Sequence, residues 1–231
     1  MKRFTTSWMR VMLLGLVSLF AFQEAGAATV SYDGINYTTS GTKATVKRYT
    51  FTKGDTTFYK GDIVIPETFE LKGVTYTVVA TAANAFVDCR ELTSLQLPKT
   101  CVTIGRNCFK GCTALKNDPT PATATSLGNG YLQDCSSITE VTIPAGVSGK
   151  FTAQNLAGMT SLKKITFADS ETPFKISVLA FVNKLGEGVK SPIEEIYFGR
   201  NLDEGSGSNM PFRGIKTLKK VTFGGNFTTV D

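Results

Sequence analysis

Few side chains in this sequence could carry chemistry, and the five cysteines are the most regularly spaced of them. Cys89, Cys112 and Cys135 recur at an interval of 23 residues, whereas Cys101 and Cys108 fall between them. Such a series could bind a metal, form disulfides or pack as a column of small buried thiols. Zinc sites use paired cysteine clusters, and only Cys108 and Cys112 approach that spacing. We therefore expect buried thiols with no metal and no cofactor, although export would permit a disulfide.

Groups for acid–base or nucleophilic catalysis are scarce as well. The chain contains no histidine, which removes every Ser-His-Asp and Cys-His arrangement and the commonest neutral metal ligand. Neighbouring carboxylates such as Glu194 and Glu195 could in principle act as a pair. They are adjacent on one expected strand, however, so their side chains should point to opposite faces. The sequence therefore predicts a protein that is not an enzyme.

The segments that hold these residues belong to an internal repeat. From residue 86 onward an aromatic or leucine is followed by x2, Cys, x2, Leu, x2, Leu, x, Leu. The pattern returns every 23–25 residues, with one longer interval attributed to extra residues at 183–189. Repeats of this length with L-x-x-L-x-L are typical of leucine-rich repeats, which have one short strand per turn. The copies begin at Phe86, Phe109, Leu132, Leu156, Phe181 and Phe212.

Local signals suggest how each copy is built. A proline such as Pro98 follows the expected strand, where a missing amide donor ends the ladder. Ile104-Gly105 and Leu127-Gly128 predict a return turn before the next aromatic. One unit cannot bury its own apolar face, so the copies must stack. The sequence therefore predicts a β-rich leucine-rich-repeat solenoid of five to six repeats over residues 78–231. Each 23–25-residue repeat would contribute a parallel strand, with a short helix or turn on the convex side.

Two stretches depart from the regular pattern. Residues 116–121 replace the apolar strand of the second copy, and Pro119 and Pro121 predict a local interruption of the sheet there. No polar cap follows Phe223, although the terminal repeats of a solenoid need one. We therefore expect that the C-terminal rung could support self-association.

Residues 28–77 are predicted to form an N-terminal β-rich cap. This segment alternates β-branched and polar residues, with turn signals at residues 33–34 and 72–73. Ile63 and Ile65 have the spacing of Leu95 and Leu97, and a proline follows each pair. This likeness predicts a degenerate rung that joins the cap to the main sheet.

A leader precedes the cap. Three basic residues, Lys2, Arg3 and Arg10, precede an apolar run at residues 11–22, and an Ala-Gly-Ala site follows the run. This combination is typical of a secretory signal peptide over residues 1–27. The run is too short to span a bilayer, where about 20 residues are needed. We therefore expect an exported chain, at the outer surface, in the periplasm or outside the cell, with no membrane span in the mature protein.

The repeats resemble those of a known bacterial family. Val102-Thr-Ile-Gly, followed by Cys108-Phe-Lys-Gly-Cys-Thr-Ala-Leu, is similar to the BspA-like surface leucine-rich repeats of Treponema and Bacteroidetes. The resemblance covers about residues 78–223, and the segments at 32–37, 63–66 and 73–78 resemble the family's N-terminal region. It implies an extracellular or outer-surface protein whose relatives bind host matrix proteins or other cells.

Two columns of side chains should face outward on the predicted strands. The charges of the first column alternate in sign, and opposite charges on neighbouring strands stabilise a sheet by about a few tenths of a kcal/mol. A self-paired stripe is therefore the favoured interpretation of that column, with ligand binding as the alternative. Tyr197, in the uncharged second column, is the strongest single contact candidate, because exposed aromatic residues are common hot spots. The first outer column is Ser94, Asn117, Glu140, Lys164, Glu195 and Lys220, and the second outer column is Gln96, Thr142, Thr166, Tyr197 and Thr222.

These features favour recognition or adhesion, with a host matrix or cell-surface protein or glycan as the partner. A structural spacer or assembly segment is the alternative, supported by the self-paired charges and the uncapped last rung. The net charge of +6 comes from dispersed basic residues, which argues against nucleic acid as a partner. A polysaccharide hydrolase is the least favoured function, since no residue constellation supports it.

Overall fold

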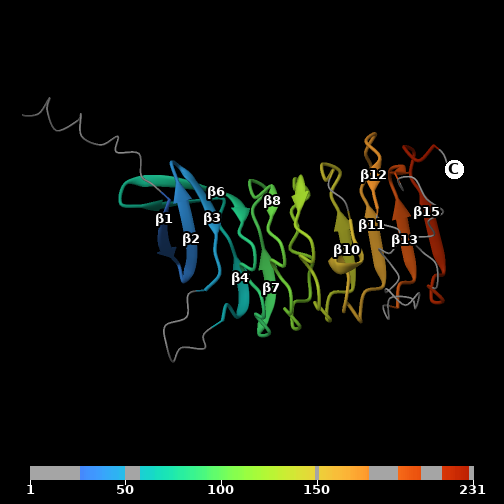
Figure 1. Ribbon diagram of the computed structural model, residues 1–231, viewed down its shortest axis with the longest axis horizontal. Helices are drawn as coiled ribbons and strands as arrows, with labels where there is room; N and C mark the ends of the chain where they lie inside the picture. The colour runs from blue at the N-terminus through green and yellow to red at the C-terminus, as the bar shows by residue number, and fades with distance from the viewer. Residues whose placement is uncertain (1–26, 50–57, 149–150, 177–191, 204–214, 229–231) are drawn as a thin grey trace, which may run out of the picture.

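In a computed structural model of the chain, short strands are stacked side by side along the long axis of the molecule, and most of them run across that axis (Figure 1). The structure describes residues 27–49, 58–148, 151–176, 192–203 and 215–228. The predicted signal peptide up to residue 26, the predicted loop at 183–189, Phe181 and Phe212 lie outside these ranges. Within them, no helix has the length and apolar character needed to cross a membrane.

The principal sheet is parallel and takes one strand from each of four rungs. Its order is β10 (Glu140–Ile143), β11 (Lys164–Phe167), β13 (Glu195–Phe198) and β15 (Lys220–Phe223). Residues at the same repeat position face one another across every pair. The predicted parallel strand per repeat is therefore confirmed for these rungs.

The predicted degenerate rung is present as well. Strand β4 (Gly61–Val64) pairs in parallel with β7 (Leu92–Gln96), and Ile63 lies opposite Leu95. The backbone amide of Ile65 continues the ladder by donating to the carbonyl of Gln96 at 2.9 Å. The spacing of the isoleucines thus indicated both the pairing and its register.

Between β7 and β10 the sheet is interrupted at residues 116–121, as the two prolines predict. Side chains take the place of the missing strand. The amide of Asn117 accepts from Leu95 N at 3.2 Å and donates to Leu95 O at 2.7 Å. On the other side, Asp118 Oδ2 accepts from Thr142 N at 3.0 Å. Two polar side chains therefore satisfy backbone groups of both flanking strands.

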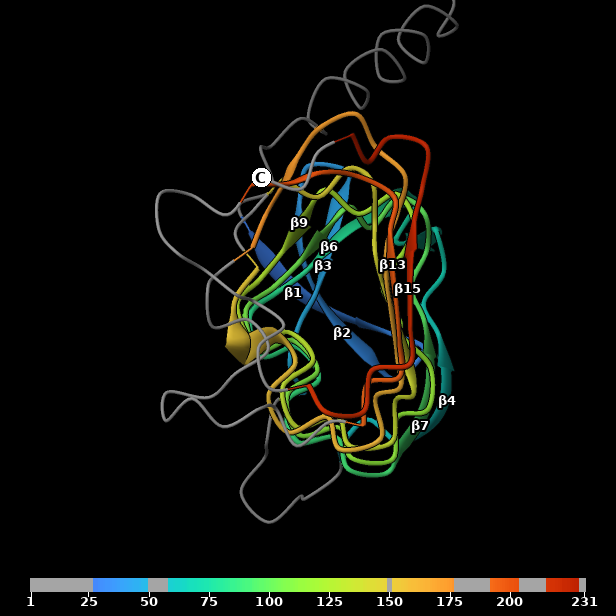
Figure 2. The same cartoon turned by 90° about the vertical axis from the view of Figure 1, so that its right-hand side faces the viewer.

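A second sheet forms the opposite wall of the molecule (Figure 2), and this corrects the prediction of one strand per repeat. Ile104-Gly105 and Leu127-Gly128 were expected to mark turns. Instead Thr103–Ile104 (β8) and Ser126–Leu127 (β9) are short parallel strands that extend this sheet. Its remaining members are β1 (Ala28–Tyr32), β2 (Ile35–Ser40), β3 (Lys43–Val46), β5 (Thr68–Leu71) and β6 (Val74–Thr81).

Gly105 is needed because successive rungs approach closely. A Cβ atom there would lie 2.3 Å from the carbonyl carbon of Ala82, and one at Gly128 would lie 2.3 Å from the amide nitrogen of Arg106. The two glycines therefore permit backbone contact between rungs, where the sequence had suggested a change of direction.

The remaining regular elements are few. Strand β12 (Phe174–Lys175) pairs in parallel with β14 (Leu202–Asp203). The one helical element in the described ranges is the 3₁₀ turn η1 (Ala153–Asn155). The expected short helix or turn between strands is thus a turn in nearly every described rung.

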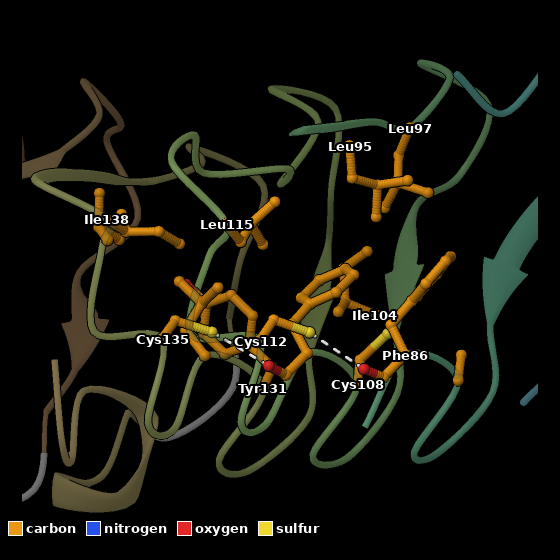
Figure 3. Packing of buried hydrophobic residues seen from close by; sticks show 14 of the residues in the cluster. Phe86, Leu95, Leu97, Ile104, Cys108, Cys112, Leu115, Tyr131, Cys135 and Ile138 are labelled. Atoms are coloured by element: carbon orange, nitrogen blue, oxygen red, sulfur yellow. Dashed lines mark hydrogen bonds between the residues drawn. The ribbon is translucent and has the colours of Figure 1, made fainter. Parts of the chain in front are cut away.

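Repeated side chains fill the space between the two walls (Figure 3). The rings of Phe86 and Phe109 stack at 5.6 Å between centroids. All five cysteines are free and buried. The thiols of Cys112 and Cys135 each lie 3.0 Å from a carbonyl oxygen of the preceding rung, that of Phe86 and that of Phe109. The predicted column of buried thiols is therefore confirmed.

Candidate functional site

The outer face of the principal sheet carries the side chains that the sequence singled out. Strand pairing places Glu140, Lys164, Glu195 and Lys220 in one row across β10, β11, β13 and β15. The intervening residues, such as Ile165 and Ile196, are buried. The same register places Thr142, Thr166, Tyr197 and Thr222 in a parallel row.

Two of the predicted site residues lie apart from these rows. Ser94 and Gln96 belong to β7, where they face Asp62 and Val64 of β4. The interruption at 116–121 separates that pair of strands from the principal sheet. The structure therefore brings eight of the ten predicted site residues together and leaves Ser94 and Gln96 outside the group.

The first outer column is only partly self-paired. Lys164 Nζ lies 3.7 Å from Glu140 Oε2, and both side chains are exposed. Among the described residues, Glu195 and Lys220 form no ion pair within 4.0 Å. An exposed ion pair contributes about 0–1 kcal/mol to stability, so a ligand can replace the contact between Lys164 and Glu140 at little cost in free energy. The favoured prediction of a fully self-paired stripe is therefore wrong for its last two members.

The two adjacent glutamates do not form a carboxylate pair that could act in catalysis. Glu194 binds Lys219 at 2.9 Å, and this hydrogen bond with its charge lowers the pKa of Glu194. Glu195 instead lies on the outer face of β13. Within the described part of the chain, no three His, Cys, Asp or Glu residues are grouped to hold a metal.

Six of the eight grouped residues line a hollow that crosses β11, β13 and β15. Its volume is about 380 Å³, within the range of pockets that take small ligands. We call it the strand-face hollow. It is lined by Lys164, Thr166, Glu195, Ile196, Tyr197, Lys220 and Thr222.

Tyr197 is held in place at the centre of the strand-face hollow. Its hydroxyl donates to Asp169 Oδ1 at 2.9 Å, and this bond raises the pKa of the tyrosine. Glycines leave room for the pair, since a Cβ at Gly224 would lie 2.5 Å from the Tyr197 hydroxyl and 2.6 Å from Asp169 Oδ1. The half-buried ring is thus fixed in orientation, which lowers the entropy lost on binding.

Comparison with protein families decides what kind of chain carries this surface. The profile of the BspA type leucine rich repeat region matches six copies over residues 80–200. The chain belongs to the BspA-type leucine-rich-repeat family. The resemblance in the cysteine-containing repeats is thereby confirmed.

Solved structures agree with the BspA-type fold. The chain is similar to a leucine-rich-repeat protein of T. pallidum, with 19% identity, a TM-score of 0.61 and coverage of 85% of this chain and 86% of that one. It is also similar to a leucine-rich cell surface protein of Faecalibacterium prausnitzii, with 22% identity, a TM-score of 0.57 and coverage of 86% of this chain. It spans 55% of the F. prausnitzii chain. A comparison with curated proteins found no match.

Sequence reasoning missed a buried arginine in this BspA-type chain. Arg200 is fully buried, and its guanidinium donates to the carbonyls of Pro144, Ala145 and Val147 at 2.8, 3.0 and 3.1 Å. It also lies 4.6 Å above the ring of Phe174. Burial lowers its pKa. Arg200 lies two residues after the end of β13, the strand of Tyr197, and ties that rung to the loop after β10, two rungs away.

A second hollow, also missed, lies among the N-terminal strands of the BspA-type chain. Its volume is about 380 Å³, and its lining includes Tyr37, Tyr49, Phe58, Tyr59 and Asp62. The hydroxyl of Tyr37 is buried without a hydrogen-bond partner in the described residues, and burial raises its pKa. No outer column reaches this hollow, so the strand-face hollow remains the better-supported candidate.

Proposed function

We propose that this BspA-type chain is an exported, non-catalytic recognition module with residues 28–77 as its N-terminal cap. It would bind a host matrix or cell-surface protein or glycan through the outer face of β11, β13 and β15. The observation that carries the proposal is the strand-face hollow, in which Tyr197 is held among charged and hydroxyl side chains. An oriented aromatic ring among polar groups is a common arrangement at binding surfaces.

Location outside the cell is part of the proposal. The first 27 residues have the composition of a secretory signal peptide. The F. prausnitzii protein of similar fold is a cell surface protein. Both observations support export of this chain, after which the strand face would meet matrix or cell-surface partners.

The first experiment is a binding screen of the mature chain, residues 28–231, against matrix proteins and glycans. A strand-face variant with Lys164, Glu195 and Tyr197 changed to alanine is tested beside it. We expect a ligand that binds the unchanged chain and is lost in this variant. Binding that survives the variant would place the site elsewhere, and the absence of any ligand would contradict the recognition function.

A matched control keeps this result specific. Tyr32, Glu70 and Lys72 are the same residue types and are exposed on β1, on β5 and in the turn after β5, away from the strand face. Their combined change to alanine should leave the binding unchanged. Equal loss in both triple variants would point to a general effect on folding or charge, which circular dichroism would reveal.

A structural role is the second candidate, and exposed apolar residues of β15 favour it. Val221 is 41% exposed and Phe223 is 54% exposed. The ring of Phe223 stacks on Phe198 at 5.7 Å between centroids and contacts the ring of Phe227 at 4.5 Å, yet more than half of Phe223 remains exposed. Concentration-dependent association in sedimentation, abolished by an appended polar cap or by Phe223→Lys, would favour a spacer or assembly segment.

A further inference from the structure

The strand-face hollow has a charge order that restricts its ligand. Lys164 and Lys220 occupy the first outer column on β11 and β15, and Glu195 lies between them on β13. Neighbouring strands are about 4.8 Å apart, so the two lysine positions are separated by roughly 10 Å along the stack of rungs. The hollow therefore presents positive, negative and positive groups at equal steps.

Both lysines are available to a ligand. Lys220 is exposed and makes no ion pair within 4.0 Å among the described residues. Lys164 has one carboxylate at 3.7 Å, and its side chain remains 42% exposed. An exposed ion pair of this kind contributes little to stability, so an anionic group of a ligand can replace the Glu140 carboxylate.

The adjoining second outer column is neutral. Thr166 and Thr222 flank Tyr197 and offer hydroxyl groups that both donate and accept hydrogen bonds. The Tyr197 ring is held by Asp169, so it offers a fixed apolar surface beside these hydroxyls. A sugar ring has an apolar face and a rim of hydroxyls, which suits this combination.

From these observations we propose that the strand-face hollow binds a linear acidic polysaccharide with one anionic group on every second sugar. The polymer would lie across β11, β13 and β15, with its anionic groups at Lys164 and Lys220. The sugar between them would place hydroxyl or amide donors at Glu195. This inference rests on the proposed recognition function and specifies the ligand class for the same surface.

The position of Glu195 between the lysines is the reason for expecting an anionic group on every second sugar only. Each sugar of a linear polysaccharide has a length close to the spacing between neighbouring rungs. A polymer with an anion on every sugar would therefore bring one anion against the Glu195 carboxylate, where like charges repel. A neutral polymer would offer no anionic group to either lysine. An acidic peptide could meet the lysines, but it has no ring for Tyr197 to pack against.

The test is a calorimetric titration of the mature chain, residues 28–231, with four probes of similar length. Hyaluronan oligosaccharides carry a carboxylate on every second sugar, polygalacturonate carries one on every sugar, and chitin oligosaccharides carry none. Polyglutamate represents an acidic peptide. We expect hyaluronan to bind most tightly and to weaken as salt concentration rises, because ions screen exposed charges.

Two double variants of equal net charge isolate the hollow. Lys164→Gln with Lys220→Gln should weaken hyaluronan binding by about tenfold, as expected for the loss of two exposed ion pairs. Lys163→Gln with Lys219→Gln removes the neighbouring lysines, which do not line the hollow. The second pair should change the affinity by less than about twofold. Glu195→Gln should increase the affinity for polygalacturonate, because it removes the repelling carboxylate.

Several outcomes would overturn this ligand class. They are equal binding of chitin oligosaccharides, stronger binding of polygalacturonate to the unchanged chain, equal sensitivity to the two double variants, and polyglutamate binding with the same sensitivity. If hyaluronan fails while the array yields another ligand that depends on Tyr197, the ligand class is wrong and the recognition function stands. If neither experiment yields a ligand, both proposals are wrong.

Discussion

The side-chain amide of Asn117 pairs with the backbone of Leu95 as a neighbouring strand would. It accepts from Leu95 N at 3.2 Å and donates to Leu95 O at 2.7 Å. One residue further on, the Asp118 carboxylate accepts from Thr142 N at 3.0 Å. These two side chains bridge the interrupted rung between β7 and β10, and they hold the sheet together where two prolines prevent a strand.

Asn117→Ala should reduce the free energy of unfolding by about 1–3 kcal/mol, because it leaves both backbone groups of Leu95 without partners. Urea denaturation followed by circular dichroism measures this change. Asn226→Ala is the control, since Asn226 is exposed. An effect of Asn117→Ala no larger than that of the control would show that water replaces the amide.

The stability contributed by Asp118 should depend on pH. Burial raises the pKa of its carboxyl above the ordinary value, although hydrogen bonds from Thr120 and Thr142 act in the opposite direction. Its contribution is therefore fully present below the unfolded-state pKa and is lost as pH rises through the raised folded-state pKa. The unfolding free energy of the unchanged chain, relative to Asp118→Asn, should fall over that window. A difference that rises with pH would contradict the raised pKa.

Gly105→Ala tests the close approach of successive rungs. The new Cβ would lie 2.3 Å from backbone atoms of Ala82, so the rungs must separate. We expect a loss of about 3 kcal/mol in unfolding free energy. Gly225→Ala is a matched control, because a Cβ there meets nothing within 4 Å. Similar stabilities for the two variants would show that the backbone adjusts without cost.

The buried thiols should resist alkylation in the folded chain. Burial raises the pKa of Cys101 and of Cys135 to about 12, so little thiolate forms at neutral pH. Iodoacetamide should react at least about a hundredfold faster after unfolding in urea than before. Asn226→Cys adds an exposed thiol that should react at once in the folded chain. Rapid native labelling of Cys101 or Cys135 would show that the rungs open.

The sequence allowed prediction of the features that depend on local alternation. The spacing of Leu95 and Leu97 predicts an inward-facing strand, and Ile63 at the same spacing predicts its partner. The rows through Lys164 and Tyr197 follow from the same period. These predictions succeed because a side chain's direction on a strand depends only on its position along the strand.

Features that depend on contacts between distant residues could not be predicted in this way. Two-residue strands such as Thr103–Ile104 form only when the next rung stacks, so they appear as turns in the sequence. The bond from Tyr197 to Asp169 joins residues 28 positions apart. Arg200 resembles an exposed residue after a strand, yet its carbonyl partners lie 53–56 positions away.

Arg200→Met should have two opposite effects on the free energy of unfolding. The change removes a buried charge, which by itself would stabilise the fold. It also leaves the carbonyls of Pro144, Ala145 and Val147 without their donor, and each loss costs about 1–3 kcal/mol. We expect the second effect to prevail, with a net loss of about 2–4 kcal/mol in urea denaturation. Arg200→Lys should also destabilise, because an ammonium group lacks the planar fork that reaches three carbonyls.

The control for Arg200 is Arg90→Met, at an exposed position, which should leave the unfolding free energy nearly unchanged. If Arg200→Met were as stable as the unchanged chain, the free-energy cost of desolvating the guanidinium would equal the stabilisation from its three hydrogen bonds. The arginine would then serve to fix the position of the rung that carries Tyr197. In that case Arg200→Met should still weaken ligand binding at the strand-face hollow, because the loop after β10 would no longer be tied to β13.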